Sequence, residues 1–365
     1  MTSFIIERDK LLSNTKEILS RAGDAKVFAV VKGNGYGFGT DEYLKLLFES
    51  GIRNFAVTDA DDAVKIKDMN FPDTDILMLR STSIVEEVQK LIDNDIILTI
   101  GSISAAKTTN DISSGIGKKC RVHVKINSGM GRYGFLPDDY DSIRSVFTDF
   151  TSIDICGFFT HFPCAFKSKS NTRKQLDVFL KLLDTLNSEN FDCGTVHFSN
   201  SAYLFGFKSP LGDAVRIGSA FTGRIANKPS NSNLARVGYI KSQICEMQTL
   251  PRGATAGYGS AYTAKKEIRT AVIPVGYADG FNTEKSRDTY RFRDGIFYAL
   301  SEIKRMLTKK SYYGRINGKL CKILGHVGMT HTVLDVTNVS CSIGDDVILD
   351  VNPIYVSERI PREYV

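Results

Sequence analysis

The sequence lacks several features that would assign a protein to a class at once. Tryptophan is absent, and no stretch approaches the roughly 20 apolar residues that a membrane-spanning helix needs. The seven cysteines are an odd number and form no Cys-x-x-Cys pair. Neither a metal site nor a framework of disulfides is therefore expected, and the plain interpretation is reduced thiols in a cytosol.

Runs of basic residues are missing too. Lys and Arg exceed Asp and Glu by only 47 to 41, with no run of five or more basic residues. We therefore expect no nucleic-acid partner and no membrane partner, while attraction of small anions stays open. The first residues, MTSFIIERDK, lack the basic, apolar and small-residue regions of a signal peptide. These absences favour a cytoplasmic protein.

What the chain does contain, from about residue 25 to 217, is an alternation of β-branched runs with helical periodicity. The apolar residues of 84–92 and 176–186 recur at the spacing of a helix with one buried face. A doubly wound open sheet is the rival, but eight strands in so few residues favour an α/β fold with a closed, TIM-like (β/α)₈ barrel. The predicted strands are 27–32, 54–57, 75–79, 96–100, 121–126, 153–159, 195–198 and 214–218.

The pattern changes after a polar, proline-containing segment at 227–236, which is typical of a linker. Beyond it, strand-like runs follow one another without helical alternation, and Asn317-Gly318 between two of them predicts a tight hairpin. We therefore predict a barrel over 1–228 and an all-β domain over 229–365. The charged stretch 281–312 is predicted to be a helical insertion within the second domain.

Lys32 is the first candidate catalytic residue. It directly follows the apolar run VFAVV and precedes glycines at alternate positions in KGNGYGFG. Barrel active sites form where strands end, glycines let a ligand approach the backbone, and a partly desolvated lysine suits Schiff-base chemistry. The stretch is neither a phosphate-binding P-loop nor a GxGxxG motif. By position alone, a solvated lysine after a strand is the commoner interpretation.

Further motifs change that balance. They arrive in the order HVKINSGMGRYGF, GFFTHFPCA, VHFSNSA, AVRIGSAFTGR, GYGSAYTA and IPVGYADGF. With VVKGNGYG before them and RIPR near the end, the chain resembles the alanine racemase family of pyridoxal 5′-phosphate (PLP) isomerases over nearly its whole length. The motifs are highly specific together, whereas each alone would be weak.

The resemblance implies how the cofactor would be held. Lys32 would bind PLP covalently, and hydroxyl and amide groups would surround the phosphate. Arg216 would face the pyridine nitrogen, and because a guanidinium keeps its proton, that nitrogen would stay unprotonated and side reactions would be limited. The phosphate residues implied are Tyr36, Asn200, Ser201, Gly218 and Ser219.

The resemblance also implies two bases, one for each face of the substrate's Cα. Lys32 would serve one face and Tyr258 the other. Phenols lose their proton only near pH ~10, so a tyrosine base needs help from nearby positive charge or hydrogen bonds. His161 and Arg216 are the candidates for that help. Other implied roles are the substrate carboxylate for Arg132, the pocket lining for Tyr277 and Met329, and a carbamylated lysine that holds Arg132 for Lys125.

Purely structural roles are the alternative for some of these residues. His123 is expected to be structural, satisfied on or under a strand, whereas His161 and His197 are predicted to follow strands at the barrel mouth. Without the motifs, Tyr258 and Tyr262 would be ordinary aromatic residues of a β domain.

The sequence departs from the family pattern in two places. In GHVGMTH the methionine, Met329, is retained, but His326, Gly328 and Thr330 stand where Arg, Cys and Asp are usual. Glu358 replaces the tyrosine that normally precedes the RIPR-type ending, and a carboxylate beside a phosphate would be repelled. We therefore expect an altered pocket that accepts alanine, or else serine, a cationic amino acid or a broad range.

Two other functions are open at this stage. A related barrel-type PLP decarboxylase shares the lysine chemistry, but its glycine-triplet and Cys-Asp/Glu-x-x-Asp patterns are absent. A PLP carrier without turnover would be a single barrel, whereas this chain has a second domain with Tyr258. The resemblance further implies a head-to-tail homodimer in which Lys32 and Tyr258 of one site come from different chains.

Overall fold

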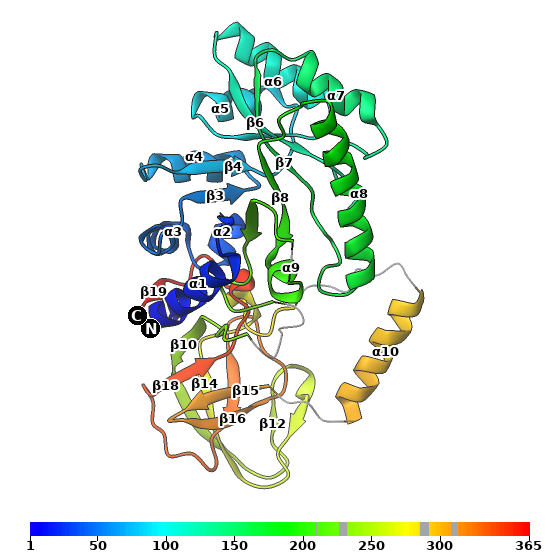
Figure 1. Ribbon diagram of the computed structural model, residues 1–365. Coiled ribbons are helices and arrows are strands. Elements are labelled where there is room, and N and C mark those ends of the chain that lie inside the picture. Colours follow the sequence, from blue (N-terminus) through cyan, green and yellow to red (C-terminus); the bar gives the residue numbers. More distant parts are fainter. Residues whose placement is uncertain (209, 226–231, 285–291, 308–311) are drawn as a thin grey trace. The chain divides into compact units, whose positions relative to one another are not determined.

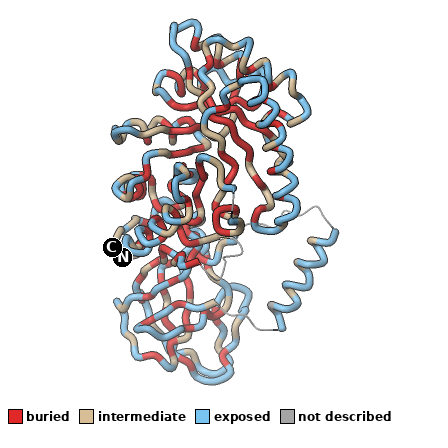
Figure 2. Tube along the Cα trace, in the orientation of Figure 1, coloured by how far each residue is buried: buried red, intermediate tan, exposed pale blue. Residues whose placement is uncertain are grey.

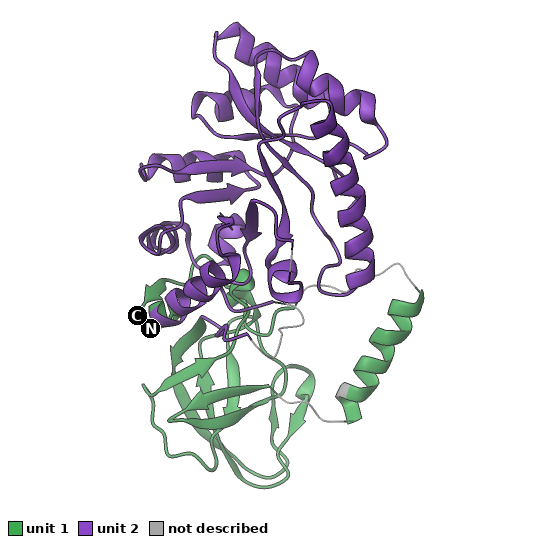
Figure 3. Ribbon diagram, in the orientation of Figure 1, with its two compact units in different colours: residues 1–8, 238–365 green, residues 9–237 purple. Residues whose placement is uncertain are grey.

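The computed structural model describes residues 1–208, 210–225, 232–284, 292–307 and 312–365. The chain divides into two compact units (Figure 3). Unit 2 comprises Asp9–Val237, and unit 1 comprises Met1–Arg8 together with Gly238–Val365. The predicted linker 227–236 and the predicted boundary at 228 fall largely on residues 226–231, which lie outside the described residues.

Unit 2 is a parallel eight-stranded sheet with the order β4-β3-β2-β9-β8-β7-β6-β5 (Figure 1). A parallel bridge between Leu77 and Ile97 joins β4 to the segment that leads into β5 and closes the barrel. The predicted barrel is therefore confirmed. Its strands are β2 (Lys26–Val30), β3 (Asn54–Val57), β4 (Asp75–Met78), β5 (Leu98–Ile100), β6 (Cys120–Lys125), β7 (Ile153–Phe159), β8 (Thr195–Asn200) and β9 (Ala214–Ile217).

Helices follow most of these strands, and side-chain caps fix where several of them begin. Asp59 accepts backbone N–H groups at the start of α4, and Ser102, Ser168 and Asn200 do the same for α6, α8 and α9. The helices of the unit are α1 (Arg8–Ala22), α3 (Thr40–Glu49), α4 (Ala60–Asp68), α5 (Val85–Asp93), α6 (Ile103–Gly115), α7 (Tyr140–Thr148), α8 (Lys169–Ser188) and α9 (Ser201–Gly206).

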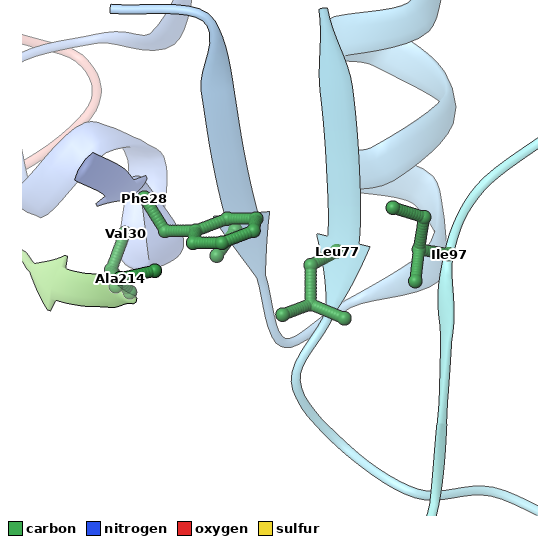
Figure 4. Close-up of a cluster of buried hydrophobic side chains, with 6 residues drawn as sticks. Phe28, Val30, Leu77, Ile97 and Ala214 are labelled. Atoms are coloured by element: carbon green, nitrogen blue, oxygen red, sulfur yellow. The ribbon is translucent and has the colours of Figure 1, made fainter. Parts of the chain in front are cut away.

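The barrel strands are buried on both faces, which explains their nearly continuous apolar sequences. Figure 2 shows them in red beneath the paler helices. Side chains from several strands meet in the interior, where Phe28, Val30, Ala56, Leu77, Ile97 and Ala214 form one buried cluster (Figure 4). This packed interior makes the barrel a rigid support for residues at its mouth.

The glycine-rich stretch after β2 adopts an unusual backbone. In the short segment α2 (Lys32–Tyr36), φ is positive at Gly33, Asn34, Gly35 and Tyr36, with values from 50° to 63°. Glycine has no Cβ to resist this left-handed region, and asparagine tolerates it better than most residues do. The glycines therefore allow the chain to coil left-handedly directly after Lys32.

Unit 1 is a mainly antiparallel nine-stranded sheet with the order β11-β14-β17-β16-β15-β18-β10-β1-β19. β1 (Ser3–Ile6) pairs with β10 and, in parallel, with β19, so the first residues belong to this unit. The other strands are β10 (Tyr239–Gln243), β11 (Glu246–Leu250), β14 (Ile268–Ile273), β15 (Tyr313–Ile316), β16 (Lys319–Leu324), β17 (Thr332–Asp335), β18 (Asp346–Leu349) and β19 (Arg362–Tyr364), with β12 (Thr255–Ala256) and β13 (Tyr262–Thr263) forming a small second sheet.

The hairpin prediction for the second region is confirmed. Asn317 and Gly318 both have positive φ and join β15 to β16, as the hairpin prediction requires. The predicted insertion contains helix α10 (Phe292–Leu307), while 285–291 and 308–311 lie outside the described residues. Short 3₁₀ turns are η1 (Tyr258–Ser260), η2 (Tyr277–Asp279) and η3 (Pro353–Tyr355). Among the described helices, none has the length and apolar character needed to cross a membrane.

Candidate active site

A cavity of about 310 Å³, the barrel cavity, lies at the carboxyl ends of the strands in unit 2. Four basic residues line it, namely Lys32, Lys125, Arg132 and Arg216, and no described lining residue is acidic. This imbalance favours anionic ligands. The cavity also contains the predicted residues Tyr36, His161, Asn200, Ser201, Gly218 and Ser219, so the structure brings all the barrel candidates together.

Lys32 lies immediately after β2, where its side chain opens into the barrel cavity. Partial burial of its amine lowers the pKa of Lys32, and the positive charge of Arg132 lowers it further. No described residue accepts a hydrogen bond from this amine. A lysine in this state has a larger fraction of neutral, nucleophilic amine than one in free solution.

Arg216, on β9, is held by a network of buried hydrogen bonds. Its Nη2 donates to the carbonyl of Thr160 at 2.6 Å, and its Nη1 lies 2.7 Å from Nδ1 of His197. Since the guanidinium can only donate, Nδ1 of His197 accepts, and its Nε2–H therefore points to Nδ1 of His123 at 2.8 Å. Burial lowers the pKa of Arg216 to about 9, so it remains charged at neutral pH.

The same network corrects one prediction. His197 does not follow a strand at the barrel mouth, because β8 continues to Asn200 and His197 is fully buried within it. Burial, and then the charge of Arg216, lower the pKa of both His197 and His123, that of His123 to about 3. Both imidazoles are therefore neutral, and His123 is structural, as expected.

Tyr36, Ser201 and Gly218 form a polar cradle on one side of the barrel cavity. A Cβ at Gly218 would stand 2.2 Å from Oη of Tyr36, so only glycine lets this hydroxyl approach the backbone so closely. The N–H of Gly218 donates to Oγ of Ser201 at 3.2 Å. Burial raises the pKa of Tyr36 to about 12, which keeps the hydroxyl protonated and able to donate.

Asn200 lines the barrel cavity beside this cradle. Its Oδ1 caps α9 by accepting from the N–H of Tyr203 at 3.0 Å, and its Nδ2 donates to the carbonyl of Phe162 at 3.0 Å. The side chain is thus engaged within the protein. It fixes the start of α9, and with it the position of Ser201.

Lys125 is almost completely buried at the end of β6. Its Nζ donates to the carbonyl of Ile126 at 2.6 Å and lies 5.3 Å from the ring centre of Phe159. Burial, helped by the charges of Arg216 and Arg132, lowers the pKa of Lys125 to about 7. The fraction of neutral amine at neutral pH is therefore much larger than for a lysine in free solution.

Arg132 lies in the loop after β6, which Asn127 shapes by accepting three backbone N–H groups with its Oδ1. The Nη2 of Arg132 donates to Oη of Tyr133 at 3.0 Å.

His161 also lines the barrel cavity. Burial, and then the charge of Arg216, lower the pKa of His161 well below its usual range, so it offers a hydrogen bond and not a charge.

Unit 1 has a cavity of its own, the unit 1 cavity, of about 380 Å³. Tyr258 and Met329 line it beside three departures from the family pattern, His326, Gly328 and Thr330, and beside His331. Tyr258 is 76% exposed. Oγ1 of Thr330 lies 3.0 Å from Nδ1 of His331, which gives the cavity a polar edge.

Tyr277 is fixed next to this cavity through its backbone. Its N–H donates to the carbonyl of Gly328 at 3.0 Å. Asp279 caps the same turn by accepting from the N–H of Gly276, and it is held in turn by Arg359 at 2.7 Å. The three unit 1 candidates, Tyr258, Tyr277 and Met329, therefore belong to one neighbourhood within the unit.

Glu358 is exposed in unit 1. Burial lowers the pKa of Arg362, and the nearby charge of Glu358 opposes part of that shift.

Comparison with known protein families accounts for both units. Residues 6–225 match the model of the alanine racemase N-terminal domain, and residues 237–358 match that of the alanine racemase C-terminal domain. The chain belongs to the alanine racemase family. The predicted resemblance is therefore confirmed, and with it an isomerase family that depends on PLP.

Individual relatives support this assignment over nearly the whole chain. An alanine racemase of Halothermothrix orenii is 29% identical, with 96% of this chain and 93% of the relative covered. An alanine racemase of Clostridium perfringens is 28% identical, with 94% and 84% covered. The solved structure of an alanine racemase of Clostridium difficile 630 has a TM-score of 0.85 and 27% identity, with 100% and 95% covered.

The barrel cavity of this alanine racemase family member fits PLP by its donor set. The cradle at Gly218 provides hydroxyl and amide donors at a place where a Cβ would block them. Lys32, at the start of α2, has an amine that donates to no described residue. The Nε–H of Arg216 donates to no described residue, although both its terminal nitrogens do. A phosphorylated aromatic aldehyde would use each of these groups.

Sequence reasoning missed Tyr133 and the support of Arg216 by the two buried histidines. The signal was present, because alternate residues of a strand share one face. His123 lies two residues before Lys125 in β6, so a lysine directed inward implies an inward histidine. Tyr133 carries no such periodic signal, because it lies in a loop.

Proposed function

We propose that this protein interconverts L- and D-alanine, with PLP as cofactor and with Lys32 and Tyr258 as the two bases. The observation that carries the proposal is the barrel cavity, which combines the strand-end lysine Lys32 with three other basic residues and, among the described residues that line it, no acidic one. An amino acid and a phosphorylated cofactor each bring an anionic group to such a cavity. We also propose a cytoplasmic location.

The residues of unit 2 divide the work between holding and proton transfer. Lys32 would attach the cofactor, and Tyr36, Ser201, Gly218 and Ser219 would bind its phosphate with hydroxyl and backbone N–H groups. When bound, the cofactor withdraws electron density from the Cα of the amino acid. Lys32, released by the incoming substrate amine, would then take or return a proton at Cα, for which its lowered pKa suits it.

Arg216 would present its Nε–H to the ring nitrogen of the cofactor. Because it keeps its charge at neutral pH, that nitrogen would stay unprotonated and the ring would withdraw electrons only moderately. Moderate withdrawal favours exchange of the Cα proton over transamination. His197 holds the guanidinium from the opposite side and so fixes its orientation.

Arg132 would bind the substrate carboxylate from the edge of the barrel cavity. Lys125 supports the idea of carbamylation, because only a neutral amine attacks CO₂ and its pKa of about 7 supplies one at neutral pH. The resulting carboxylate would offset the positive charges around it and hold Arg132 in place.

Tyr258 would serve the second face of Cα. It belongs to a different unit from Lys32 and is largely exposed, as expected of a residue that a second copy of the chain would cover. We therefore propose a head-to-tail homodimer in which Tyr258, Tyr277 and Met329 of one protomer complete the barrel cavity of the other.

Serine is the second candidate substrate. The polar edge of the unit 1 cavity, formed by Thr330 and His331 beside Tyr258, could bind a hydroxyl group. A cationic amino acid is less favoured, because no described residue that lines the barrel cavity carries a negative charge.

Deuterium exchange at Cα in D₂O, with a panel of L- and D-amino acids, tests the reaction and the substrate together. We expect exchange accompanied by inversion, fastest for alanine and next for serine. Exchange with loss of CO₂ would identify a decarboxylase, and absence of any exchange by the PLP-loaded protein would identify a carrier.

Mixing two inactive variants tests the shared site. A mixture of Lys32→Ala and Tyr258→Phe protomers that have exchanged subunits should regain up to about a quarter of wild-type activity, because a mixed dimer has one intact site. No recovery, with subunit exchange verified by mass, would contradict the head-to-tail arrangement.

A further inference from the structure

Helix α10 presents its apolar side chains to the outside. Along its sixteen residues, apolar side chains recur at 292, 296, 299, 300, 303, 306 and 307, which at 100° per residue places them within an arc of about 120°. All seven are exposed, including Leu300 at 59% and Ile303 at 52% (Figure 2). The helix thus has a continuous apolar face in contact with solvent.

The orientation of the helix is the reverse of the usual one. Its three described half-buried residues are Asp294, Tyr298 and Glu302, which recur every four residues on the polar side. A surface helix of a globular protein ordinarily buries its apolar stripe and exposes its polar side. The exposed apolar face is therefore available to something outside unit 1.

The charge of the insertion indicates what that partner is. Residues 281–312 contain eight basic and four acidic side chains, so this segment carries a net +4 of the whole chain's +6. An amphipathic helix with Phe, Leu, Ile and Met on one side, in a segment of net positive charge, binds at the interface of a membrane with anionic lipids.

Pairing with α10 of a second copy fits less well. The helix spans about 24 Å, or little more than two heptads, whereas a coiled coil is sustained over about three or four. Its apolar arc is also wider than the narrow seam that two helices share, and Phe297, which is exposed as well, lies outside it. A flat lipid surface accommodates both features.

We propose that α10 is an interfacial helix that docks this enzyme on an anionic membrane surface. The enzyme would lie on the membrane without spanning it. The lack of a basic run led us to expect no membrane partner, and the exposed apolar face revises that expectation. The proposal is independent of the reaction that the enzyme catalyses.

Flotation of the full-length, PLP-loaded protein with lipid vesicles tests the proposal. We expect binding to vesicles with about 30% phosphatidylglycerol in phosphatidylcholine, little binding to pure phosphatidylcholine, and weaker binding as salt rises. Leu300→Glu and, separately, Ile303→Glu should lower binding about tenfold or more, since each places a carboxylate in the apolar face. Ser301→Glu adds the same charge outside that face and should retain most of the binding.

Racemisation without vesicles should be equal in the three variants, which shows that they fold. Failure of the wild-type protein to bind anionic vesicles would overturn the proposal, and so would equal binding to neutral vesicles. A lower oligomer mass of Leu300→Glu in light scattering, with no vesicle binding by the wild type, would instead assign the face to protein contacts and equally overturn it.

Discussion

In the barrel cavity, Lys125 and Arg216 are buried, whereas Tyr258 and Tyr277 around the unit 1 cavity are exposed. Arg216 rests on His197 and Thr160, and the pKa values of Lys32, Lys125 and Arg216 are all shifted by burial. Tyr258 and Tyr277 instead sit on short 3₁₀ turns between loops, and both are exposed. The barrel thus shifts the pKa values of its own groups by burial, while unit 1 presents its tyrosines to solvent.

Among the substitutions in the barrel cavity, Lys32→Arg should cause the largest loss of racemisation. The guanidinium keeps the charge but cannot attack a carbonyl group, so covalent attachment and one base are lost together. We expect racemisation to fall by about 10⁴-fold or more. Borohydride reduction followed by peptide mass analysis should find the cofactor attached at position 32 only in the wild type, and attachment elsewhere would contradict the assignment.

Tyr258→Phe tests the unit 1 side, with a smaller expected loss of about 10²- to 10⁴-fold. The barrel still provides Lys32, so deuterium should continue to enter one enantiomer without inversion. Tyr262→Phe, in neighbouring β13, is the matched control and should keep most activity. Equal loss of exchange in both enantiomers would argue against a two-base division between the units.

Gly218→Ala tests whether the cradle depends on bare backbone. The added Cβ would overlap Oη of Tyr36, while φ at Gly218 is not in the left-handed region, so the effect is steric alone. We expect PLP affinity, followed by near-violet absorption, to fall about 10- to 100-fold. Gly206→Ala, where a Cβ would meet no atom within 4 Å, should bind PLP normally. Equal affinities would show that the cradle does not hold the phosphate.

The contrast between the units also explains what could be predicted. Strands and their ends were predictable where β-branched runs stop at a polar residue, which located Lys32. The end of β8 was not, because Ser199 and Asn200 continue the strand through pairing with β9 and not through their own preference. The placement of β1 was likewise hidden, because Phe4 pairs with residues more than 230 positions away.

The left-handed backbone after Lys32 could not be predicted from the sequence either. The alternate glycines after Lys32 indicated an accessible loop, but their left-handed coil depends on Asn34 and Tyr36 adopting positive φ as well. Positive φ is unfavourable for a bulky residue such as Tyr36, so the surrounding structure has to hold it there. For Tyr258 and Tyr277, the family motif identified the residues, and the backbone turns that present them became visible only in the structure.

The smallest expected effect is a test of the lowered pKa of Lys125, through the pH dependence of stability. Its pKa is about 7 in the folded barrel against an ordinary 10.5, so between these values the unfolded chain binds a proton that the folded chain lacks. The free energy of unfolding should therefore rise with pH from about 7 to 10.5, by up to about 1.4 kcal/mol per pH unit, and the contribution should be lost as pH falls to 7.

The measurement is denaturant unfolding in CO₂-free buffer, expressed as the difference in slope between the wild type and Lys125→Met. Lys26→Met removes an exposed lysine from the start of β2 and should keep the wild-type slope. Bicarbonate should diminish the slope of the wild type alone, because a carbamylated lysine no longer titrates as an amine. If the slope of Lys125→Met equals that of the wild type, the amine is charged in the folded barrel, and carbamylation would lack the neutral nucleophile it needs.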